Sequence, residues 1–220
     1  MRKLILALTI TLFFPVIVHA EISVIGAGAV NAEPNIVRVN MGVTTTHANL
    51  NAALEQNTAA MNRLRTGLVQ MGIAEEHITT TGFWVYRTFN WDAMGASEEV
   101  HGVDNMFIIT LVDMNMLNNV IETAVSLGAT NIHGVNFDTT NRADYYLQAL
   151  ALAIQDGNAK ATAIARALNR PLGPLSSVVE EPGVIWGMPL RVAAEADGFG
   201  GPITPPTELT VSASIRMTFQ

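Results

Sequence analysis

Hydrophobic and polar positions follow two different periods along the chain. Apolar residues fall at every second position in residues 35–46 and 209–219, which predicts strands with one buried face. They recur at steps of three and four in residues 50–71 and 142–168, which predicts two amphipathic helices. In the longer helix, the residues expected to form the buried face are Leu147, Leu150, Ile154, Ala161, Ile164 and Leu168.

Shorter segments complete the predicted order of elements. Strands are expected over residues 22–28, 77–91, 100–112, 132–139 and 172–181. Asp113 is placed to cap a short helix, and Asn141 to cap the long one. Residues 35–139 therefore run strand, helix, two strands, helix, strand, which is the split βαβ pattern of ferredoxin-like units. The predicted fold class is α+β, with an antiparallel or mixed sheet packed with helices, a long third helix and C-terminal strands.

The first twenty residues have the layout of a cleavable secretory signal. Arg2 and Lys3 precede an apolar run from Leu4 to Val18, and Ala20 supplies a small residue at the cleavage position. A membrane-spanning helix needs about 20 apolar residues, and this run is shorter and contains Pro15. We therefore expect residues 1–20 to be removed, residues 21–220 to act in the periplasm, and no stable membrane insertion after cleavage.

Charge and cysteine content narrow the classes of function. Loss of Arg2 and Lys3 changes the formal net charge from −7 to −9, which disfavours binding to nucleic acid. The chain has no cysteine, so it has no disulfide, no thiolate metal ligand and no cysteine nucleophile.

The motifs that could carry catalysis are weak. Gly26-Ala27-Gly28 follows a predicted strand, but Asn31 stands where a dinucleotide fingerprint needs glycine or alanine, so a bend between two strands is the preferred interpretation. Hydrolase nucleophile motifs are absent. The histidines show no metal-ligand spacing; they are His47, His77, His101 and His133. We expect no catalytic residue, no cofactor and no metal.

Aromatic residues suggest a contact surface instead. Apolar side chains of the strand predicted over residues 77–91 fall on both of its faces, so it is either covered twice or meets another subunit. A proline- and glycine-rich segment, residues 182–206, carries further large apolar residues. Aromatic residues and methionine are enriched at interfaces, which favours self-association. The candidate interface residues are Trp84, Phe89, Trp91, Trp186, Met188 and Leu190.

Several stretches of the mature chain are similar to one bacterial family. They include Ile25-Gly26-Ala27-Gly28, Gly72-Ile73, Gly128-Ala129 and, best matched, the helical stretch from Ala149 to Leu168. On these residues the chain resembles the SIMPL-domain family, which includes periplasmic immunogenic proteins and proteins linked to oxidative stress defence. The resemblance implies an α+β fold, a periplasmic location and possible homo-oligomers, but no catalytic reaction.

Two functional hypotheses follow. The first is a non-enzymatic periplasmic protein that supports envelope integrity or oxidative stress defence through binding or self-assembly. Its partner, whether a protein or a small molecule, is unknown. The alternative is a periplasmic enzyme with a spatially assembled polar site and an unknown reaction.

Overall fold

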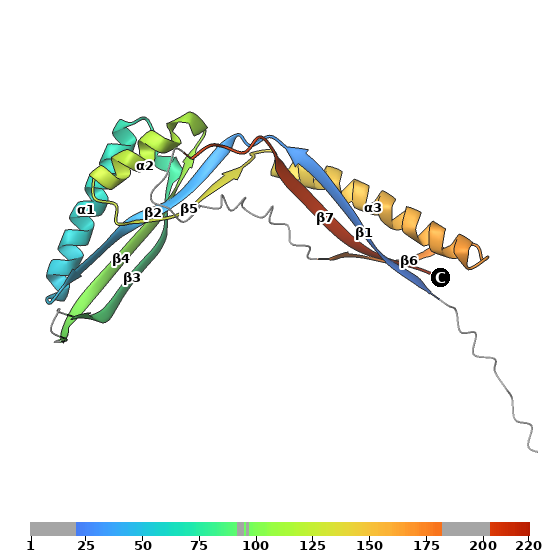
Figure 1. Ribbon diagram of the computed structural model, residues 1–220, viewed down its shortest axis with the longest axis horizontal. Coiled ribbons are helices and arrows are strands. Elements are labelled where there is room, and N and C mark those ends of the chain that lie inside the picture. Colours follow the sequence, from blue (N-terminus) through green and yellow to red (C-terminus); the bar gives the residue numbers. More distant parts are fainter. Residues whose placement is uncertain (1–20, 92–94, 96, 182–202) are drawn as a thin grey trace, which may run out of the picture.

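The computed structural model describes residues 21–91, 95, 97–181 and 203–220. These residues form two antiparallel sheets, each covered by helices on one face (Figure 1). The arrangement confirms the predicted α+β class. The expected signal sequence, residues 1–20, lies outside the described residues. No helix in the described part of the chain is long and apolar enough to cross a membrane.

The larger unit has the ferredoxin-like order expected from the sequence. Its sheet runs β3-β4-β2-β5, and each neighbouring pair is antiparallel. The elements are β2 (Ile36–His47), α1 (Leu50–Gln70), β3 (Ile78–Trp91), β4 (Ser97–Leu111), α2 (Leu117–Ser126) and β5 (Asn131–Asp138).

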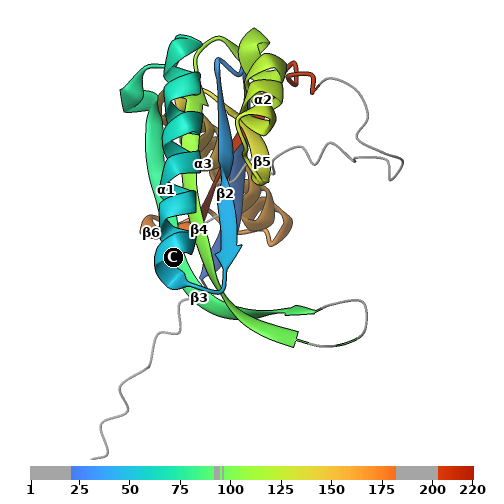
Figure 2. The ribbon, with the colours of Figure 1, turned by 90° about the vertical axis from the view of Figure 1, so that its left-hand side faces the viewer.

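Helices α1 and α2 cover one face of this sheet, which we call the helix side (Figure 2). Val39 of β2 and Ile109 of β4 are completely buried there with Leu64 and Leu68 of α1. Burial of each such side chain contributes roughly 1.5–3 kcal/mol. The opposite face carries no helix, and we call it the open side.

The ends of the shorter helices follow the sequence signals. The side chain of Asn49 accepts a hydrogen bond from the Ala52 N–H at the start of α1. Gly72, with φ of 94°, terminates the same helix in a conformation that side chains disfavour. Asp113 accepts from the Asn115 N–H before α2, as predicted.

The smaller unit combines the first and last strands of the described chain with the long helix. Its sheet has the order β1-β7-β6, and α3 lies mainly over β1 and β7. The elements are β1 (Ile22–Ala32), α3 (Arg142–Ala167), β6 (Leu175–Glu181) and β7 (Leu209–Phe219).

The predicted buried face of α3 is largely wrong. Leu147 and Leu168 are 62% and 60% exposed, and Ile154 and Ile164 are also exposed, whereas Ala161 is buried as expected. The residues that face the sheet are instead small and four apart: Ala149, Ala153, Gly157, Ala161 and Ala165.

Close approach of β1 explains this difference. A Cβ atom on Gly26 or Gly28 would clash with the carbonyl oxygens of Ala153 and Ala149. The backbone of β1 therefore packs directly on the backbone of α3, and only small side chains fit between the strand and the helix. The two glycines lie inside a continuous strand, so the predicted bend at Gly26-Ala27-Gly28 is also wrong.

The chain passes between the units through residues 33–35 and 139–141, which are tied together. The side chain of Asn35 donates to the Thr140 hydroxyl and accepts from its backbone N–H, each at 2.9 Å. Beside them, Asp138 accepts from Arg38 of β2 and from Arg142 of α3. The side chain of Asn141 makes no capping bond, contrary to prediction.

Candidate functional site

Strand β3 is an edge strand whose apolar side chains remain largely exposed. It pairs with β4 on one side only, and the ends of β3 and β4 extend together beyond the other strands as an arm (Figure 2). Trp84, Phe89 and Trp91 are 55%, 54% and 72% exposed, and Phe83 and Val85 are exposed as well. Beyond Ile78, the described residues leave much of both faces of β3 uncovered, so the predicted contact with another molecule remains a prediction.

A bulge determines which face each side chain takes. The β3–β4 register shifts between Thr80 and Gly82, so the alternation that begins with buried Ile78 is displaced by one residue. Phe83, Val85, Phe89 and Trp91 consequently share the helix side, beyond the cover of α1. Trp84 and Tyr86 lie on the open side, opposite Asp104 and Gly102 of β4.

The two rings on the open side lie over neighbouring glycines. A Cβ atom on Gly82 would overlap the outer atoms of the Trp84 indole, and one on Gly102 would lie 2.5 Å from the Tyr86 ring. Each ring therefore occupies the space above a glycine. Partial burial, followed by the charge of Asp104, raises the pKa of the Tyr86 hydroxyl above its ordinary value.

A row of hydrogen-bonded polar side chains continues from Trp84 across the sheet. Asp104, opposite Trp84, accepts from the Thr44 hydroxyl, and Thr44 accepts from the Asn131 side chain at 2.5 Å. Together with Trp84, these three polar side chains give one residue from each of the four strands. The sequence analysis did not single out Asp104, Thr44 or Asn131. Glycines within aromatic strands were the available signal, because they mark positions that a neighbouring ring can cover.

The candidate interface residues are not all brought together. Phe89 and Trp91 share one face of the arm, whereas Trp84 is on the opposite face. Trp186, Met188 and Leu190 lie outside the described residues.

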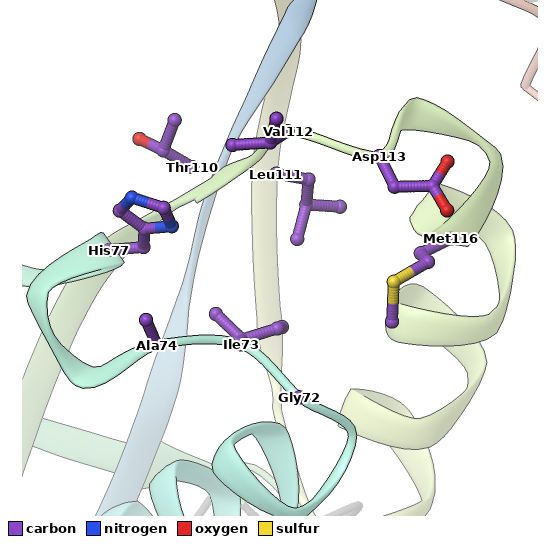
Figure 3. Close-up of a pocket in the computed structure, with 9 residues that line it drawn as sticks. All are labelled: Gly72, Ile73, Ala74, His77, Thr110, Leu111, Val112, Asp113 and Met116. Carbon is purple, nitrogen blue, oxygen red and sulfur yellow. The ribbon is translucent and has the colours of Figure 1, made fainter.

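A shallow pocket of about 260 Å³ lies between the end of α1 and the start of α2 (Figure 3). Ile73, Leu111 and Met116 form part of its apolar lining, and His77 and Asp113 are its ionisable residues. These two side chains lie on opposite sides of the pocket, and the Asp113 carboxylate caps the turn before α2. Within the described chain, this pocket is where the enzyme hypothesis can be tested.

The histidines are only partly dispersed. His47 and His101 stand directly opposite each other on β2 and β4, and the ring of His47 accepts from the Asn49 N–H. His77 and His133 lie elsewhere. Among the residues that the structure describes, no group of three histidine, aspartate or glutamate side chains is arranged to hold a metal ion.

The family model for SIMPL, described as a protein of unknown function (DUF541), matches residues 22–219. The chain belongs to the SIMPL family. The match confirms the resemblance inferred from sequence and extends from β1 to β7, so the SIMPL domain comprises both sheet-and-helix units. A search of curated proteins found no matching relative.

Proposed function

We propose that this SIMPL domain is a non-enzymatic periplasmic protein that supports envelope integrity or oxidative stress defence through self-assembly. The observation that carries the assembly part is the exposed helix side of the β3 arm, where Phe89 and Trp91 lie. The periplasmic location is supported by the signal-like residues 1–20 and, like the stress role, by the SIMPL resemblance.

Edge strands explain why β3 is the expected contact. An exposed strand edge invites pairing with another chain, and proteins usually protect such edges. The free edge of β1 is protected, because Asp156 of α3 accepts from the Ala27 N–H and Lys160 donates to the Ile25 carbonyl. No comparable cover lies on β3 among the described residues.

The chemistry of the arm suits a protein partner. Aromatic side chains bury large areas on association and are enriched in interfaces. Arg87 and Glu99 form an exposed ion pair at 3.2 Å on the same arm, which adds directional polar contacts at the rim. A second copy presents the same combination of apolar and paired charged groups.

Light scattering on the mature protein, residues 21–220, tests assembly. We expect an oligomer for the wild type and a shift toward monomer for the Phe89→Ala/Trp91→Ala variant. The matched control is Leu147→Ala/Leu168→Ala, which removes equally exposed apolar side chains from α3 and should leave the mass unchanged. A wild type that stays strictly monomeric at high concentration contradicts the proposal.

A cellular test addresses location and role. N-terminal sequencing should find a chain that begins at Glu21 in the periplasmic fraction. A deletion strain challenged with peroxide should survive less well than its parent. The wild-type chain should restore survival, whereas Phe89→Ala/Trp91→Ala should not. A full-length, cytosolic chain or equal survival of all strains contradicts the proposal.

A further inference from the structure

Trp84 and Tyr86 differ from the other apolar residues of β3 in face, orientation and surroundings. From this geometry we propose a second binding surface, on the open side of the larger sheet, for an extended uncharged glycan. Trp84 and Tyr86 are its stacking platforms, and Asp104 is its hydrogen-bond acceptor. The proposal does not depend on assembly, because Phe89 and Trp91 occupy the opposite face.

Both rings are placed against the sheet before any ligand binds. The indole of Trp84 lies over Gly82 and the phenol of Tyr86 over Gly102, and both side chains remain partly exposed to solvent. Residues two apart on a strand are about 6–7 Å apart, so the two platforms are neighbours on one nearly flat surface. Little conformational entropy remains to be lost when a ligand stacks on them.

Directional polar groups lie next to the rings. Asp104 is opposite Trp84, and one carboxylate oxygen accepts from Thr44, which Asn131 holds in turn. The second oxygen has no partner among the described residues and can accept from a hydroxyl group. The row thus fixes an acceptor at the edge of an aromatic platform.

A glycan matches this combination better than the other ligand classes. A sugar ring with equatorial hydroxyl groups presents an apolar C–H face to an aromatic face, while its hydroxyls reach polar groups at the rim. Anionic ligands are disfavoured by the Asp104 carboxylate and by the mature charge of −9, reached from −7 when Arg2 and Lys3 are lost. An apolar peptide offers the Asp104 row only backbone N–H donors, whereas each sugar ring carries several hydroxyl donors. Two platforms on a flat sheet favour a straight, β-1,4-linked chain.

Calorimetric titration of the mature protein with cellotetraose and chitotetraose tests the proposal, with α-linked maltotetraose as the comparison ligand. We expect saturable binding of at least one β-linked tetrasaccharide and weaker binding of maltotetraose. Trp84→Ala and Tyr86→Ala should each weaken binding by about tenfold, and Asp104→Ala should also weaken it. Tyr86→Phe retains the ring and should bind nearly as the wild type does.

Phe89→Ala/Trp91→Ala is the control, because it removes two exposed rings from the other face of the same strand. Its glycan affinity should equal that of the wild type even where its assembly is lost. Absence of saturable binding to both β-linked ligands at millimolar concentration would overturn the proposal, as would unchanged affinity in Trp84→Ala. An oligomer that Trp84→Ala dissociates would assign Trp84 to self-assembly and overturn the glycan assignment.

Discussion

Asp156 of α3 accepts a hydrogen bond from the backbone N–H of Ala27 at 2.8 Å, although the two residues are 129 positions apart. Lys160, one turn later, pairs with Asp156 at 2.6 Å and donates to the Ile25 carbonyl. The two residues are four apart on α3, a spacing that brings opposite charges together on a helix surface. In the structure the pair also bonds two backbone groups at the open edge of β1, where a fourth strand would otherwise bind.

The first prediction concerns this edge. Asp156→Ala/Lys160→Ala should leave the β1 backbone groups open to solvent and to other chains. We expect several-fold faster hydrogen exchange at the Ala27 amide and more aggregation on storage, measured by NMR and light scattering. Asp144→Asn, which removes an exposed charge from the first turn of α3, should change neither quantity.

The second prediction concerns Asp138 and pH. Burial alone would raise the pKa of Asp138, but hydrogen bonds from Arg142, the Thr139 N–H and Arg38 outweigh it and hold the pKa below its ordinary value. A carboxylate whose pKa is lowered in the native state contributes its full stabilisation at pH values above its unfolded-state pKa of about 3.9. This contribution is lost as the pH falls through the native-state pKa.

Asp138→Asn should therefore lower the free energy of unfolding by about 1–3 kcal/mol at neutral pH. The difference from wild type should shrink in strongly acidic buffer, where the wild-type carboxyl is protonated. Denaturant unfolding across an acid pH series measures this. A difference that stays constant with pH would show that charge is not its cause.

The third prediction concerns Gly28. Gly28→Ala places a Cβ against the Ala149 carbonyl, a backbone atom that cannot rotate away. We expect a loss of about 1–3 kcal/mol or more in unfolding free energy. Ala29→Val adds volume at the next residue, which is exposed on the other face of β1, and should cost little. Equal effects would contradict the close packing of α3 on β1.

The fourth prediction concerns Asn57, a buried polar residue of α1. Its Nδ2 donates to the carbonyls of Val43 and Val103 at 2.8 and 3.1 Å, while its Oδ1 has no partner among the described residues. Asn57→Ala should lower the unfolding free energy by about 1–3 kcal/mol, because two buried carbonyls lose a donor. Asn57→Asp should lower it further at neutral pH, because it sets a carboxylate against those carbonyls. Gln56→Ala, at an exposed neighbour, is the control.

Much of the fold could be predicted from local patterns. Period-two alternation placed β2 and β7, and Gly72 and Asp113 marked helix boundaries because their conformational and capping properties act within a few residues. The order of elements over residues 35–139 was enough to indicate a ferredoxin-like unit. These features depend on residues that are close together in the sequence, so the sequence alone is enough to predict them.

The failures come from contacts between distant segments. The heptad-like spacing of Leu147, Leu150 and Ile154 predicted a buried stripe, but glycines in β1 selected the alanine stripe instead. No pattern inside the helix distinguishes these two faces. The open-side row was missed for the same reason, since Trp84, Asp104 and Thr44 become neighbours only through the β3 bulge and the strand register.

The pairing of β1 with β7 joins Ile22 to Phe219, so β1 finds its partner only after every strand of the larger sheet and α3 have been synthesised. The smaller sheet cannot close until β7 has emerged from the ribosome. A chain that lacks β7 therefore leaves the smaller unit without its closing strand.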